Sequence, residues 1–176
     1  MFSRRRSWPG AAVLLAEAFF LLARASAGYG GTNAPPTGTK LATHPAFRLA
    51  VRFAAERVEQ PLCRAIYADF VDGAGRPLRE RLERLHLSPA EHLARLVFED
   101  GDRDPLCHEA NDVIAYTSPL SPIVRVCTSR FVRTMHKSPP FAAASVLHEQ
   151  LHTLGLGENP PKPEEITERV LALCGR

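Results

Sequence analysis

Cysteine is scarce in this chain of 176 residues, and no two cysteines have the short C-x-x-C spacing of cysteine-based zinc sites. This absence argues against a zinc site built from thiolates. In an exported chain, four widely spaced cysteines instead predict two disulfides, and the sequence leaves all three pairings open. A bridge from Cys174 would fasten the last helix to the rest of the domain. The four cysteines are Cys63, Cys107, Cys127 and Cys174.

A long apolar run is also missing. Residues 1–27, "MFSRRRSWPGAAVLLAEAFFLLARASA", contain an arginine triplet, a short apolar run, and small residues at Ala25 and Ala27. This is the order of a secretory signal peptide. An N-terminal membrane anchor is the alternative, but the apolar run is short for a membrane span and Glu17 interrupts it. We therefore predict cleavage after Ala27, a secreted or periplasmic location, and no membrane contact after cleavage.

The mature chain has no excess charge of either sign. Residues 1–27 hold four arginines and one glutamate, so their removal changes 22 basic and 19 acidic residues to 18 of each. The formal net charge of +3 therefore belongs to the export signal. Because a neutral chain has no general attraction for polyanions, we expect no nucleic-acid partner.

About 149 residues remain, which is enough for one domain with a core. The Gly-, Pro- and Thr-rich residues 28–42 predict a flexible leader, and residues 43–176 a single domain without internal repeats. Helical and alternating apolar patterns together predict an α+β fold. The expected helices are 44–60, 77–87, one beginning with a capping box at Ser88, 128–138, 141–155 and 160–174. The expected strands are 63–72, the segment near 95–100, 112–118 and 123–127.

The strongest motif lies in "SVLHEQLHTLGLGENPP", residues 145–161. His148 and His152 are four residues apart, so a helix projects them from one face, where two imidazoles can hold one cation. Glu149 lies beside them and can act on water at an open coordination position. Leu147, Leu151 and Leu154 would face the core.

Zinc in a catalytic site needs a third protein ligand. Gly155 suits a left-handed helix end that turns the chain back, and Glu158 follows six residues after His152. We therefore expect His148, His152 and Glu158 to bind Zn²⁺. Glu165 is the rival ligand, although its position early in the last helix is explained by capping and the helix dipole.

The pattern H148-E149-x-x-H152-x-x-G155-x-x-E158 resembles the active-site helix of zincin metallopeptidases, and within them the metzincin pattern. No methionine follows the third ligand, since Met1 and Met135 are the only two. The string "HEQLHTLGLGENPP" with the later "EIT" also resembles uncharacterised secreted bacterial proteins.

The resemblance implies a small sheet packed on the active-site helix, with "IVRVC", residues 123–127, as the edge strand beside the substrate. It implies hydrolysis of a peptide or protein substrate, with Glu149 as the general base. Tyr116, His136 and Arg169 remain open as the donor to the oxyanion. Two alternatives also stay open: a non-catalytic secreted zinc-binding or interaction domain, and a domain without metal. The isolated histidines are expected to be solvated or hydrogen-bonded, namely His44, His86, His92 and His108.

Overall fold

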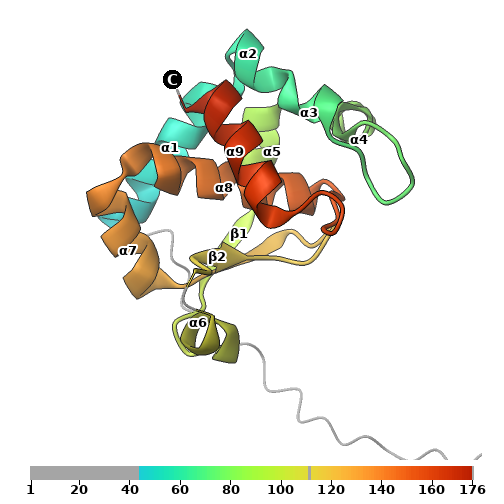
Figure 1. The fold of residues 1–176 in the computed structure, drawn as a ribbon. Helices are drawn as coiled ribbons and strands as arrows, with labels where there is room; N and C mark the ends of the chain where they lie inside the picture. The colour runs from blue at the N-terminus through green and yellow to red at the C-terminus, as the bar shows by residue number, and fades with distance from the viewer. Residues whose placement is uncertain (1–43, 111, 176) are drawn as a thin grey trace, which may run out of the picture. The chain divides into compact units, whose positions relative to one another are not determined.

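The computed structural model describes residues 44–110 and 112–175. The predicted signal peptide (1–27) and leader (28–42) lie outside the described residues, so the structure does not bear on them. Within the described part, helices cover a small sheet, and the predicted α+β class is confirmed (Figure 1).

The helices of the described residues are α1 (Pro45–Val58), α2 (Pro61–Arg64), α3 (Ile66–Asp69), α4 (Leu78–Leu85), α5 (Pro89–Arg95), α6 (Pro105–Glu109), α7 (Thr128–Lys137), α8 (Pro139–Thr153) and α9 (Pro163–Cys174). The strands are β1 (Val97–Asp100), β2 (Ala115–Tyr116) and β3 (Ile123–Val126). The capping box expected at Ser88 is present, because the Ser88 hydroxyl accepts from the Glu91 amide and the Glu91 carboxylate accepts from the Ser88 amide. The helix α6 was not expected from the sequence.

One predicted strand is wrong. Residues 63–72 form α2, α3 and the start of a turn, and only Val71 and Asp72 make isolated bridges. The buried residues Cys63, Ile66 and Tyr67 are spaced by three and four, which is helical spacing, and Pro61 occupies the first turn of α2. The β-branched and aromatic residues Ile66 and Tyr67 therefore lie on the buried face of a helix.

The sheet has the order β1-β3-β2. Val97 on β1 pairs in parallel with Ile123 on β3, whereas Ala115 on β2 pairs antiparallel with Val126. The expectation that residues 123–127 form the edge is therefore wrong, because β3 is hydrogen-bonded on both sides and lies in the centre. The strand next to α8 is β2, which is an edge.

The helix α8 is the central element of the core and packs against α1, α7 and α9, as Figure 1 shows. Every residue from Ala142 to Thr153 is buried. The three leucines Leu147, Leu151 and Leu154 are at most 3% exposed, as their spacing predicts. Because α8 is enclosed in this way, its polar side chains lie on a rigid support.

Both predicted disulfides are present. Cys63 is bonded to Cys174, so the last helix is tied to α2, as expected. Cys107 is bonded to Cys127, which joins α6 to the end of β3. No helix in the described ranges is long and apolar enough to cross a membrane.

Candidate metal centre

Two histidines of α8 lie side by side at the centre of the candidate site. The ring centroids of His148 and His152 are 4.8 Å apart, and the two residues are 8% and 4% exposed. Their spacing of four places them on one helix face, as predicted from the sequence. Two buried imidazoles therefore face the same small space.

The end of α8 turns the chain back toward these histidines. Gly155 has φ +109°, a conformation that favours glycine, and its amide donates to the carbonyl of His152. The amide of Leu156 donates to the carbonyl of Leu151. Together these bonds form a Schellman motif, which satisfies the carbonyls that a helix end leaves free. The predicted chain reversal at Gly155 is confirmed.

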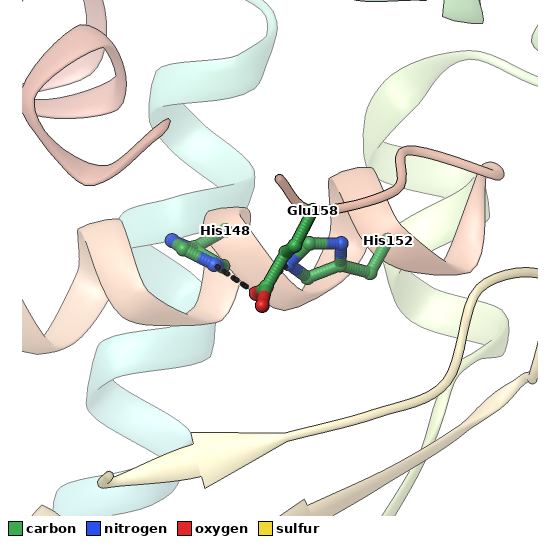
Figure 2. Close-up of side chains that lie close together, drawn as sticks. All are labelled: His148, His152 and Glu158. Atoms are coloured by element: carbon green, nitrogen blue, oxygen red, sulfur yellow. Dashed lines mark ion pairs between the residues drawn. The ribbon is translucent and has the colours of Figure 1, made fainter. Parts of the chain in front are cut away.

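The reversal brings Glu158 to the two imidazoles (Figure 2). Its Oε1 atom lies 3.1 Å from Nε2 of His152 and 3.8 Å from Nε2 of His148. One ligand atom from each of these three residues lies within 4.8 Å of the other two. With bond lengths of about 2.0–2.1 Å, the ligand atoms of a tetrahedral zinc site are roughly 3.3 Å apart. The two distances from Oε1 of Glu158 are near this value.

The rival ligand Glu165 is engaged elsewhere. Its carboxylate accepts a hydrogen bond of 3.1 Å from the amide of Lys162 at the start of α9. This is the capping role that its position in the helix suggested. The structure thus brings Glu158, and not Glu165, to the histidines.

Hydrogen bonds on the far side of each ring fix its orientation. Nδ1 of His152 lies 2.8 Å from the carbonyl oxygen of Leu156, and Nδ1 of His148 lies 2.9 Å from the Thr167 hydroxyl. A carbonyl only accepts, so Nδ1 of His152 carries a proton, and in the neutral form of the ring Nε2 has the lone pair that a metal needs. Nε2 of His152 is buried and has no hydrogen-bond partner. Partners of this kind orient metal-binding histidines.

Sequence reasoning did not find Thr167, because no spacing rule connects it with His148. It comes from α9, which packs against α8. Only the arrangement of the two helices reveals the contact. The carbonyl of Leu156 was equally hidden, since a backbone group has no sequence signal.

Burial shifts the acid–base properties of two residues on this face. It lowers the pKa of His148 to about 3, with a smaller effect from His152, so His148 is a neutral imidazole as metal binding requires. Burial also raises the pKa of Glu149 to about 8, and the charge of Glu158 adds to the effect. The Oε2 atom of Glu149 is buried without a hydrogen-bond partner.

The candidate site lies in a cleft with a volume of about 480 Å³. Its lining includes His148, Glu149, His152 and Glu158, together with residues 112–117, the segment that contains β2. Further lining residues come from α6, α8 and α9: Leu106, Phe141, Ser145, Pro163, Glu164 and Thr167. All four predicted site residues therefore border one cleft.

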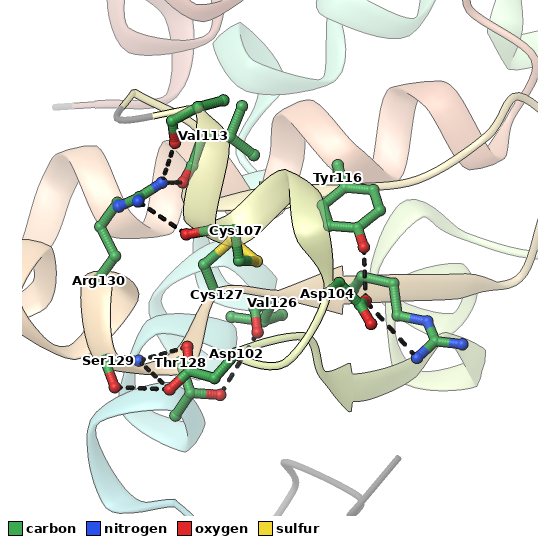
Figure 3. The surroundings of a disulfide bond; sticks show 12 residues. Asp102, Asp104, Cys107, Val113, Tyr116, Val126, Cys127, Thr128, Ser129 and Arg130 are labelled. Atoms are coloured by element: carbon green, nitrogen blue, oxygen red, sulfur yellow. Dashed lines mark hydrogen bonds and ion pairs between the residues drawn. A yellow bond between two sulfur atoms is a disulfide. The ribbon is translucent and has the colours of Figure 1, made fainter. Parts of the chain in front are cut away.

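Hydrogen bonds and a disulfide fix the segment that precedes β2, as Figure 3 shows. The guanidinium of Arg130 on α7 donates to the carbonyls of Cys107, Ala110 and Val113. The disulfide from Cys107 to Cys127 joins the same region. These contacts tie the segment that precedes β2 to α7, and so fix one side of the cleft.

The three residues considered as oxyanion donors are not gathered around His148, His152 and Glu158. The Tyr116 hydroxyl donates to Asp104 at 2.5 Å (Figure 3), although the residue lines the cleft. Arg169 is paired with Asp69. His136 is exposed on α7 and is not part of the cleft lining. The position of none of these three side chains indicates a contact with a substrate.

No protein-family model matches this chain, and neither does any curated protein or solved structure. The function is therefore inferred from the site.

Proposed function

We propose that this protein is an exported zinc-dependent peptidase with a zincin-like arrangement of sheet and active-site helix. The observation that carries the proposal is the convergence of His148, His152 and Glu158 beside the buried carboxylate of Glu149. Two imidazoles and one carboxylate are a known ligand set of catalytic zinc. The cleft beside them leaves a coordination position accessible.

The donor set fits zinc better than it fits calcium or magnesium, which prefer oxygen ligands. The Nε2 atom of His152 is buried and has no hydrogen-bond partner, and burial keeps the imidazole of His148 neutral. Both features favour coordination of a cation by nitrogen. The two disulfides are compatible with an exported protein.

When bound, zinc lowers the pKa of a water molecule to near neutrality and polarises a carbonyl group. Glu149 would accept a proton from the attacking water and return it to the leaving amine. A divalent cation held by the three ligands would offset the charge of Glu158 and so favour the ionised form of Glu149. Its buried position also keeps bulk water away from the proton.

The edge strand β2 beside the cleft favours a peptide as the substrate. β2 is paired with β3 on one side only, and the segment that contains it lines the cleft. An extended peptide can add to such an edge through backbone hydrogen bonds. Its scissile carbonyl would then lie between β2 and the histidine face of α8.

One observation supports a second candidate, a non-catalytic zinc-binding or interaction domain. Peptide hydrolysis usually needs a donor to the oxyanion besides the metal. Among the described residues considered for that role, the Tyr116 hydroxyl is bound to Asp104 and Arg169 to Asp69. The two candidates predict the same zinc binding and differ in catalysis.

The substitution Glu149→Gln separates them. We expect the variant to keep one zinc per chain, because Glu149 is not a ligand, and to lose peptide cleavage by at least about 100-fold, because it cannot take up a proton. Zinc content and cleavage of a mixed peptide library are measured on both proteins. Zinc binding without cleavage by either protein would support the non-catalytic domain, and equal cleavage by both would remove Glu149 from its role.

A further inference from the structure

A single stripe of α8 faces the cleft. It consists of Phe141, Ser145, His148, Glu149 and His152, all of which line the cleft and are linked by spacings of three or four residues. Such spacings place side chains on one face of a helix. The stripe therefore runs from an aromatic residue in the first turn to the metal ligands in the last turns.

The start of this stripe lies in an apolar part of the cleft. Phe141 is 37% exposed although it belongs to the central core helix, and Leu106 on α6 is 41% exposed. Val113 and Ile114 are further apolar residues of the cleft lining. Large apolar side chains that remain accessible in a cleft are typical of ligand-binding surfaces.

The segment around β2 runs past α8 in the same direction as the helix, as the strand arrow in Figure 2 shows. The amide of Leu120 donates to the carbonyl of His152, so the later part of this segment lies at the metal-binding end of α8. Val113 and Ile114 precede β2 and line the cleft together with Phe141. The apolar part of the cleft is thus at the end away from Glu158.

The charged lining residues of the cleft are all acidic. Besides Glu149 and Glu158 they are Asp112 and Glu164, and none of the described lining residues is lysine or arginine. A bound divalent cation would be largely neutralised by Glu158 and Glu149. The two further carboxylates would then repel an acidic substrate and attract a basic one.

We propose that the cleft selects peptides with a large apolar side chain about three residues from the scissile bond and without acidic residues nearby. This inference rests on the proposed peptidase function and names its substrate class. Phe141 and His148 are seven residues apart, which is about 10 Å along a helix. An extended peptide covers this distance in roughly three residues. Phe141 and Leu106 are the residues that determine the preference.

The test uses labelled hexapeptides that carry Leu, Phe, Lys or Asp at each position in turn. Cleavage is measured with the zinc-loaded protein, and binding is measured by fluorescence anisotropy with the zinc-loaded Glu149→Gln variant. We expect peptides with Leu or Phe at one position two to four residues from the cleaved bond to be favoured about 10-fold over Asp. Phe141→Ser and Leu106→Ser should each reduce this preference to about 3-fold or less with zinc content unchanged. Leu62→Ser, at an exposed apolar residue of α2, is the control and should leave the preference intact.

The outcomes separate the two proposals. Cleavage without a preference, or a preference that Phe141→Ser and Leu106→Ser leave unchanged, overturns the substrate class while the peptidase stands. Preferential binding of apolar peptides without any cleavage supports the apolar subsite and overturns the peptidase. Neither binding nor cleavage of any peptide overturns both.

Discussion

The carboxylate of Glu158 lies 3.1 Å from Nε2 of His152, although the helix that carries His152 ends before Glu158 is reached. The contact exists because the chain reverses at Gly155. A helix face with two histidines is thereby joined by a carboxylate from the loop that follows. The predictions below concern this geometry and the groups that support it.

Removal of the Glu158 carboxylate should weaken zinc binding. We expect Glu158→Ala to lower zinc affinity at least 100-fold, since even outer groups that only orient ligands contribute about 10–100-fold. Glu165→Ala is the matched control, because its carboxylate caps α9. It should cost about 1 kcal/mol of stability and leave zinc affinity within about 3-fold. Competition with a fluorescent chelator measures both affinities, and the reverse order would assign the ligand role to Glu165.

Thr167 should support zinc binding without contacting zinc. Thr167→Val keeps the shape of the side chain but removes the hydroxyl 2.9 Å from Nδ1 of His148, so we expect zinc affinity to fall about 10-fold. Thr167→Ser retains a hydroxyl and should restore affinity to within about 2–3-fold. The same chelator titration applies, with thermal unfolding of the metal-free proteins as a check on folding. Equal affinity of all three proteins would exclude an orienting role for the hydroxyl.

Gly155→Ala should disturb both stability and metal binding. Alanine at φ +109° is strained, and its Cβ would lie 3.0 Å from Leu120 and 3.2 Å from Asp72. We expect a loss of roughly 1–3 kcal/mol in the free energy of unfolding and weaker zinc binding, because the reversal carries Glu158. Gly157→Ala is the control in the same loop, since its Cβ would meet nothing within 4 Å. A stable Gly155→Ala variant with full zinc affinity would contradict the role of the reversal.

His92 should make the metal-free protein less stable as the pH falls below about 6.5. Burial lowers its pKa to about 4, with further effects from Arg81 and Arg95. The unfolded chain takes up a proton below about pH 6.5 and the folded chain only near pH 4, so stability is full above pH 6.5 and falls between these values. Between pH 6.5 and 4, the free energy of unfolding of His92→Asn should therefore fall by on the order of 1–3 kcal/mol less than that of the unaltered protein. Urea unfolding from pH 7.5 to 4 measures it.

The comparison needs the difference between the two proteins at each pH, since other groups titrate in the same range. His92→Asn should give a flatter dependence than the unaltered protein. Parallel curves for the two proteins would show that His92 takes up its proton equally in the folded and unfolded states.

The local elements that the sequence predicts correctly are those with strong periodic or capping signals. The apolar spacing of α8, the capping box at Ser88 and the turn at Gly155 depend on neighbouring residues, and the structure agrees with all three. Segment 63–72 was assigned wrongly because β-branched and aromatic residues suit a strand as well as a buried helix face. In the structure its buried residues have helical spacing, and α2 and α3 pack against α9.

The parts of the site that the sequence could not predict depend on contacts between distant elements. His148 and Glu158 belong to one spaced motif, so their approach was predictable. Thr167 reaches His148 from another helix, and the order of strands that makes β2 the edge depends on long-range pairing. The backbone carbonyl that orients His152 has no residue type to reveal it.

The most direct measurement is anomalous diffraction at the zinc edge from crystals of the zinc-loaded protein. We predict one peak per chain, about 2.0–2.2 Å from Nε2 of His148, Nε2 of His152 and a carboxylate oxygen of Glu158, with solvent in the fourth position beside Glu149. A peak elsewhere, no peak, or a fourth protein ligand that closes the site would contradict the proposed centre.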